Sequence, residues 1–155
     1  MNPKTLDIRL KQYNDIMKEN DELYRGMAKK LGLSECEFWI LYYLRTEYGE
    51  PMQSGICSSF YLPKQSIHSA LKKLEADGYI VQTAGGDRRS KRILLTEQGK
   101  SLCEETVDHV IRAEMEALGS LSAKEQEVFM NIFTQYTKQL KSAMQGIPEK
   151  GGNIT

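Results

Sequence analysis

The segment PKQSIHSALKKLEADGYIVQTAGGDRRSKRILLT, residues 63–96, decides the fold of this chain. Its first half carries apolar residues three or four positions apart, the spacing of one face of a helix: Ile67, Ala70, Leu71 and Leu74. Pro63 suits the first turn of that helix, because its missing N–H would have no partner there. Gly78 is a stop signal. We therefore expect a short amphipathic helix over residues 63–77.

The second half of the segment is typical of a β-hairpin. Residues 79–83 and 91–95 are rich in strand-forming side chains, and Gly85 and Gly86 lie between them. The connection is crowded with cations: Arg88, Arg89, Lys91 and Arg92. Like charges on a protruding turn repel one another, which favours a negative partner such as the DNA minor groove. The alternative is a solvated basic loop.

Helical periodicity fills the sequence on both sides of this segment. We expect helices over residues 4–31, 34–48, 53–60, 96–119 and 122–146. Ser34 with Glu37, and Ser122 with Glu125, match the S-x-x-E capping box that begins a helix. Residues 146–155 are expected to be a flexible tail. The prediction is a single, mainly α domain with one small β-hairpin.

The order of elements in residues 34–96 is that of a winged helix-turn-helix: helix, short helix, turn, exposed helix and hairpin. In this arrangement the exposed helix enters the DNA major groove, where its outward side chains meet bases and phosphates. We predict DNA contacts from the polar and basic side chains of that helix: Lys64, Gln65, Ser66, His68, Ser69, Lys72 and Lys73. The alternative for the helix taken alone is a solvated polar face.

Three short motifs carry a family resemblance. They are DRRSKRILLT (87–96) followed by Gly99, LEADGYI (74–80), and GLS (32–34) followed by the apolar residues 38–44. These motifs resemble the wing, the step from recognition helix to wing, and the entry to the second helix in the MarR (multiple antibiotic resistance regulator) family. The resemblance covers essentially the whole chain and implies a sequence-specific transcriptional regulator, a ligand- or stress-responsive repressor, that binds double-stranded DNA.

The resemblance also assigns roles in the wing. It implies that Arg89 reaches the minor groove and that Asp87 holds the Arg89 guanidinium group by a charge-assisted hydrogen bond. Arg88 and Lys91 belong to the same predicted DNA surface. Many relatives begin the recognition helix with Ser or Thr, whereas Leu62 and Pro63 stand here. A phosphate contact from a capping hydroxyl is therefore not expected.

In the family the flanking helices interlock with those of a second subunit. Residues 4–31 and 97–145 are accordingly expected to be dimerisation helices around a winged unit at 34–96, because their apolar stripes would be bare in a monomer. A two-fold homodimer places two recognition helices about one DNA turn apart, which favours a near-palindromic operator.

Regulation is a further expectation from the resemblance. A small aromatic or anionic effector, or oxidation of a cysteine, would favour a dimer whose recognition helices miss successive grooves. The aromatic residues that we expect to line an effector pocket are Tyr13, Tyr24, Trp39, Tyr42, Tyr43 and Tyr61; ordinary core packing is the alternative. Cys36 lies in the first turn of its helix, where the dipole lowers a thiol pKa, and is the candidate oxidant sensor.

Composition agrees with a DNA-binding domain of ordinary size. The chain has 155 residues, of which 40% are hydrophobic and 27% charged, and its net charge is zero. Residues 63–100 nevertheless hold eight basic and four acidic side chains, which gives this segment a charge of +4. The rest of the chain carries a charge of −4. With no apolar run of membrane length and no signal-peptide core, a cytoplasmic location is expected.

Motifs of catalysis and metal binding are lacking in the sequence. There is no G-x-S-x-G, P-loop or H-E-x-x-H pattern, and His68 and His109 fall in different predicted helices. Cys36, Cys57 and Cys103 are odd in number and widely spaced, which favours reduced, mostly buried thiols over disulfides or a metal clamp. We expect neither an enzyme nor a cofactor. The chief rival is a winged-helix module that binds another protein instead of DNA.

Overall fold

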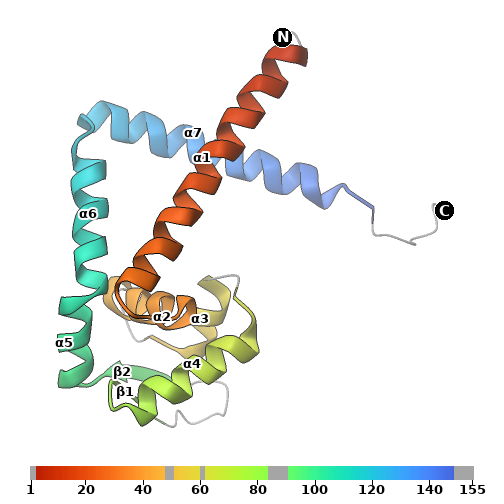
Figure 1. Cartoon of the computed structure of the whole chain (residues 1–155). Coiled ribbons are helices and arrows are strands. Elements are labelled where there is room, and N and C mark those ends of the chain that lie inside the picture. The colour runs from red at the N-terminus through yellow and green to blue at the C-terminus, as the bar shows by residue number, and fades with distance from the viewer. Residues whose placement is uncertain (1–2, 48–50, 60–61, 84–90, 149–155) are drawn as a thin grey trace. The chain divides into compact units, whose positions relative to one another are not determined.

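The computed structural model describes residues 3–47, 51–59, 62–83 and 91–148. Its elements, in chain order, are α1 (Pro3–Lys30), α2 (Glu35–Thr46), α3 (Gln53–Ser59), α4 (Lys64–Ala76), β1 (Ile80–Thr83), β2 (Arg92–Leu95), α5 (Glu97–Glu105), α6 (Val107–Gly119) and α7 (Ala123–Gln145) (Figure 1). The chain forms two compact units, Met1–Arg112 and Ala113–Thr155. The predicted mainly α fold with one small hairpin is confirmed.

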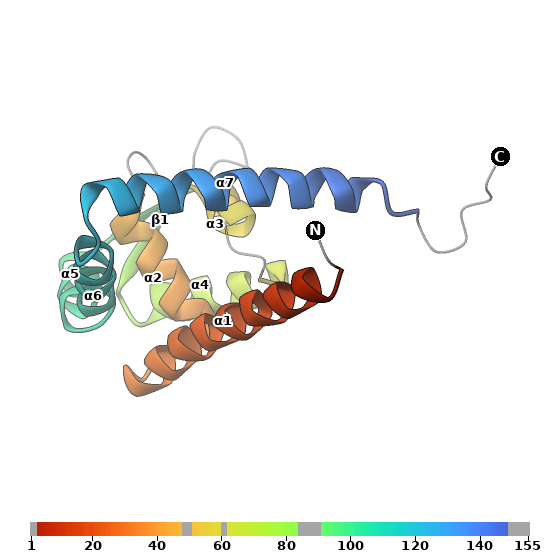
Figure 2. The ribbon, with the colours of Figure 1, turned by 90° about the horizontal axis from the view of Figure 1, so that it is seen from above.

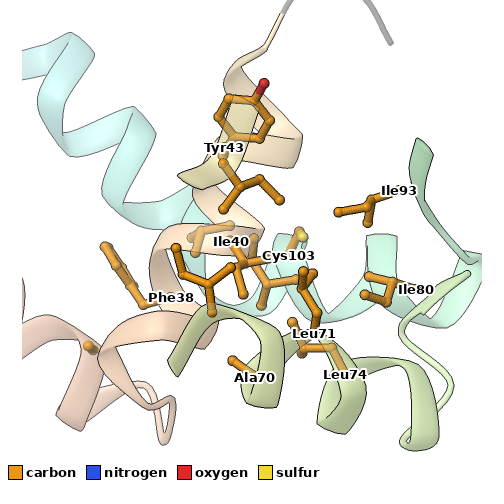
Figure 3. Packing of buried hydrophobic residues seen from close by; sticks show 14 of the residues in the cluster. Phe38, Ile40, Tyr43, Ala70, Leu71, Leu74, Ile80, Ile93 and Cys103 are labelled. Carbon is orange, nitrogen blue, oxygen red and sulfur yellow. The ribbon is translucent and has the colours of Figure 1, made fainter. Parts of the chain in front are cut away.

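The core of the first unit lies where α2, α4 and the hairpin meet. Leu71 and Leu74 of α4 are buried with Ile80 of β1 and Ile93 of β2, each at most 1% exposed. Figure 3 shows these side chains facing a shared interior together with residues of α2. Burying one such side chain contributes about 1.5–3 kcal/mol. The inward face of α4 is the one that the periodicity predicts.

The hairpin is a two-stranded antiparallel sheet whose register pairs Ile80 with Leu95 and Thr83 with Arg92. Just before α3, Met52 forms an isolated antiparallel bridge with Arg92 of β2. This bridge adds a short third segment to the edge of the two-stranded sheet. Gly78 links α4 to β1 with a φ of +81°, a left-handed conformation that favours glycine. The stop signal predicted at Gly78 is thus confirmed.

The turn from β2 into α5 depends on a second glycine. Thr96 caps α5 by accepting a hydrogen bond from the Gly99 N–H, and its own hydroxyl donates to the Gly78 carbonyl at 2.6 Å. A Cβ atom at Gly99 would lie 1.9 Å from the carbonyl oxygen of Tyr79. Only glycine therefore allows the first turn of α5 to approach the hairpin so closely.

The single helix predicted over residues 96–119 is wrong, because the structure interrupts it at Thr106. The backbone there has φ −127° and ψ −95°, which ends α5 before α6 begins. Thr106 is buried, and its hydroxyl donates to the carbonyl oxygen of Leu102 at 2.5 Å. The apolar stripe continues past the break with Val107 and Val110, so periodicity could not reveal it.

Two long helices carry exposed apolar side chains. In the second unit, α7 begins with the predicted capping box of Ser122 and Glu125 and runs as one continuous helix, as Figure 2 shows. Its Phe129 is 51% exposed and its Ile132 62% exposed. In the first unit, the early turns of α1 expose Leu6 and other apolar residues. No helix in the described part of the chain combines the length and apolarity needed to cross a bilayer.

Candidate nucleic-acid interface

The recognition helix predicted over residues 63–77 is α4, and it presents two distinct faces. Ile67, Ala70, Leu71 and Leu74 are buried. The side chains predicted to contact DNA are all exposed: Lys64, Gln65, Ser66, His68, Ser69, Lys72 and Lys73. Their exposure agrees with the prediction, whereas the DNA contacts themselves stay a prediction.

The start of α4 has no side-chain cap. Pro63 is the N-cap residue, one position before the helical turn in which we expected it, and it makes no side-chain capping hydrogen bond. Its missing N–H is harmless at this position, as it would be one residue later. The absence of a capping hydroxyl, expected from Leu62 and Pro63, therefore holds.

The exposed residues of α4 differ in their partners. The hydroxyl of Ser69 donates to the Gln65 carbonyl at 3.0 Å, and Nδ1 of His68 lies 3.4 Å from the side-chain amide of Gln53. Among the described residues, Lys64 and Lys72 have no ion pair. These two ammonium groups are therefore suited to binding phosphates.

Lys73 has an ion-pair partner within the chain. Its Nζ lies 2.6 Å from Oε1 of Glu37, the third residue of α2, whose side chain is only 6% exposed. Burial would raise the pKa of Glu37, but hydrogen bonds from Lys73 and Ser34 and the charge of Lys73 hold it below its ordinary value. The hydrogen bond to Glu37 and its charge raise the pKa of Lys73. Both groups are therefore ionised at neutral pH.

A groove of about 570 Å³ lies between the start of α2 and α4. Ser34 and Glu37 line it from the α2 end, and Gln65, Ser66 and Ser69 line it from α4. With Lys73, four of the side chains predicted to contact DNA thus line one hollow beside the recognition helix.

Most of the predicted wing contacts lie outside the described residues. Lys91 is exposed and directly precedes β2, and its carbonyl oxygen accepts a hydrogen bond from the Gln53 N–H at 3.2 Å. Asp87, Arg88 and Arg89 fall within residues 84–90, so the structure does not test their roles.

The predicted effector pocket is matched only in part. A pocket of about 520 Å³ in the first unit is lined by residues of α1, α2 and the segment after α3: Asp21, Tyr24, Arg25, Glu35, Trp39, Ser59 and Leu62. Of the predicted residues it contains Tyr24 and Trp39, whose ring centroids lie 5.1 Å apart. Arg25 was not predicted as a pocket residue, although its spacing of four residues from Asp21 places both side chains on one face of the helix.

The other predicted aromatic residues do not line this pocket. Tyr42 stacks in the aromatic cluster against Trp39 and Phe38, and Tyr43 is buried with its hydroxyl near Gly55. Tyr13 lies 11 residues before Tyr24 on α1, about 16 Å along the helix. Tyr61 lies outside the described residues. Core packing, the alternative interpretation, thus accounts for Tyr42 and Tyr43.

The premise for oxidant sensing by Cys36 is wrong. Burial raises the pKa of this thiol, and the neighbouring carboxylates of Glu35 and Glu37 raise it further, so the start of the helix does not yield a reactive thiolate. Cys103 is buried, and burial raises its pKa to about 12. Cys36 and Cys57 are half-buried, so the expectation of mostly buried thiols holds fully only for Cys103.

Comparison with known proteins finds a family match for the part of the chain that contains α2, α3 and α4. The sequence profile of the MarR family matches residues 31–90, from the end of α1 through the recognition helix to the hairpin. The chain is also 27% identical over 122 residues to the uncharacterized HTH-type transcriptional regulator YwoH of Bacillus subtilis (strain 168). That alignment covers 79% of this chain and 85% of YwoH.

Solved structures share the fold over nearly the whole chain. The MarR family regulator NMB1585 from Neisseria meningitidis superimposes with a TM-score of 0.73 and 23% identity, covering 95% of this chain and 100% of that one. A MarR family protein from Bacillus stearothermophilus superimposes with a TM-score of 0.64 and 21% identity, and the match covers 91% of this chain and 99% of that one. The three sequence motifs, the family match over residues 31–90 and these solved structures agree in a MarR-like fold for this chain.

Proposed function

We propose that this protein is a sequence-specific regulator that binds double-stranded DNA by inserting α4 into the major groove. The observation that carries the proposal is the division of α4 into a fully buried apolar face and an exposed face of polar and basic side chains. Gln65, Ser66, His68 and Ser69 offer hydrogen bonds to base edges, and Lys64 and Lys72 offer charge to phosphates.

The wing extends the proposed interface. Arg89 enters the adjacent minor groove, Asp87 orients its guanidinium group, and Arg88 and Lys91 bind the flanking phosphates. The support is the sequence motif of residues 87–96 together with the hairpin that ends in Lys91 and Arg92. A protein that acts on DNA in this way would work in the cytoplasm.

The active form that we propose is a homodimer. The exposed apolar side chains of α1 and α7, such as Leu6, Phe129 and Ile132, would be covered by a second copy. A two-fold axis would then place two α4 helices on successive major grooves of a near-palindromic operator.

The protein is proposed to act as a repressor that a small molecule releases from DNA. The pocket beside Trp39 is lined by two aromatic rings, which suit a small aromatic effector, although its carboxylates Asp21 and Glu35 outnumber the one guanidinium group of Arg25. Binding there would displace α1 relative to α2 and shift the dimer toward a spacing that no longer fits DNA.

Selection of bound sequences from a pool of random duplexes tests the function directly. The purified protein is expected to enrich a near-palindromic sequence, and Lys72→Ala should weaken binding to every duplex alike. Lys138→Ala, on the exposed surface of α7, is the control and should leave binding unchanged. Failure to enrich any sequence, with the affinity insensitive to salt, would favour the protein-binding module instead.

A further inference from the structure

We propose that Lys73 is a positioning residue for DNA recognition, which acts by fixing α4 to the start of α2 through Glu37 and not by binding a phosphate. The inference rests on the proposed binding of DNA by α4 and divides its basic residues into two kinds. Lys64 and Lys72 contact DNA, whereas Lys73 positions the side chains of α4 that contact DNA.

The carboxylate of Glu37 is a fixed acceptor. Its Oε2 accepts a hydrogen bond from the Ser34 N–H at 2.8 Å, while Ser34 Oγ accepts one from the Glu37 N–H at 3.2 Å. The remaining oxygen, Oε1, accepts from Nζ of Lys73. The capping box thus leaves the carboxylate no freedom to follow a moving lysine, because it is already bound to the helix end.

Withdrawal of Lys73 toward a phosphate would be unfavourable. The side chain of Glu37 is 6% exposed, so loss of its partner would leave a buried carboxylate without a counter-charge. Lys72, the next residue, is exposed and has no ion pair among the described residues. The two adjacent lysines therefore differ in whether the ammonium group is already bound within the chain, and only that of Lys72 is available to DNA.

The ion pair between Lys73 and Glu37 restrains the orientation of α4 in a way that the apolar contacts of this helix do not. Ile67, Leu71 and Leu74 hold the helix against the core by burial, which does not depend on direction. The start of α4 has no side-chain cap to fix it. A hydrogen bond of set length from Lys73 to Glu37 restrains rotation of α4 about its axis, because its strength falls steeply with misalignment.

The last turn of α4 is held from a second side as well. The carboxylate of Glu75 accepts hydrogen bonds from the backbone N–H and the side-chain amide of Gln82, each at 3.1 Å. Lys73 ties this turn to α2, and Glu75 ties it to β1. Glu37 and Lys73 also line the groove onto which Gln65, Ser66 and Ser69 open. A site that reads base edges needs its side chains held within about 0.5 Å, and these links provide that restraint.

The test compares Lys73→Met, Glu37→Gln and their double variant with Lys72→Met. Methionine keeps the aliphatic stem of Lys73 and removes its charge, and the double variant also removes the carboxylate charge that Lys73→Met leaves unpaired. The probe is the duplex that wild-type protein enriches from a random pool, and its affinity is measured across a range of salt concentrations. Removal of one lysine–phosphate contact lowers the steepness of log K against log salt by about 0.9, and by twice that in a dimer.

Positioning predicts that Lys73→Met and Glu37→Gln each weaken binding roughly two- to tenfold and that the double variant is no weaker than either. Their salt dependence should match wild type, while Lys72→Met lowers it. Glu37→Gln is decisive, since removal of a negative charge near DNA would by electrostatics alone strengthen binding. The inference is overturned if Lys73→Met lowers the salt dependence as Lys72→Met does, or if Glu37→Gln binds as well as wild type. If wild-type protein enriches no duplex, the proposed function fails first.

Discussion

Arg45 and Asp108 form a two-pronged ion pair between α2 and α6, although 63 residues separate them in the chain. Nε of Arg45 donates to Oδ1 of Asp108 at 2.8 Å, and one terminal nitrogen donates to Oδ2. Asp108 follows the break at Thr106 by two residues, in the first turn of α6. The pair therefore joins the winged unit to the helix that begins after the break.

Asp108→Asn is expected to lower the free energy of unfolding by about 1–2 kcal/mol. The side chains of Arg45 and Asp108 are 31% and 14% exposed, so their attraction is screened less than that of a surface pair. Urea denaturation at neutral pH measures the loss. Glu105→Gln, an exposed neighbour at the end of α5, is the control, and an equal loss there would contradict the assignment.

Gly99→Ala is expected to destabilise the fold by about 3 kcal/mol or more, because the new Cβ would meet the carbonyl oxygen of Tyr79. Gly26→Ala, within α1, has no atom within 4 Å of the added Cβ and should stabilise the chain by about 0.5–1 kcal/mol. Thermal unfolding of the two variants provides the comparison. Equal melting temperatures would show that the turn into α5 is not constrained as described.

The ion pair of Glu37 and Lys73 predicts a pH dependence. The folded-state pKa of Glu37 lies below its ordinary 4.5, so its contribution to stability is present above pH 4.5 and is lost as pH falls through the lower folded value. The stability difference between wild type and Glu37→Gln should therefore vanish at acid pH. Denaturant unfolding at a series of pH values measures it, and a difference that grew on acidification would reverse the sign of the argument.

Local signals in the sequence predicted the parts of the fold that depend on neighbours in the chain. The capping box of Ser34 and Glu37, the buried face of α4 and the stop at Gly78 each follow from residues within a few positions. The break at Thr106 was missed because the apolar spacing continues through it. The partner of Lys73 was missed because it lies 36 residues away, on another helix. The lowered pKa expected for Cys36 was not found because burial and the carboxylates of Glu35 and Glu37 raise the pKa of this thiol.

The proposed dimer predicts that a charge on the apolar face of α7 will dissociate it. Ile132 is 62% exposed in the single chain, and an Ile132→Asp side chain would be buried without a partner in a dimer. Sedimentation at micromolar concentration should show wild type as a dimer and this variant as a monomer. Lys138→Asp, on the same helix, is the control. Wild-type protein that sediments as a monomer would contradict the dimer.

Arg89→Ala should test the wing separately from α4. Loss of a minor-groove guanidinium is expected to weaken binding to the enriched duplex by about 1–3 kcal/mol. The measurement is a titration of labelled duplex, with Arg9→Ala on α1 as the control for loss of a positive charge elsewhere. Unchanged affinity in Arg89→Ala would remove the wing from the interface.

The salt dependence of duplex binding by wild-type protein is the most direct measurement of all. Four basic side chains on each subunit, Lys64, Lys72, Arg88 and Lys91, would neutralise eight phosphates in a dimer, which gives a log–log slope of about −7. A slope of that size, made shallower by Lys72→Ala, is the result expected if α4 and the wing form a cationic surface for DNA. A slope near zero, unaffected by that substitution, would contradict it.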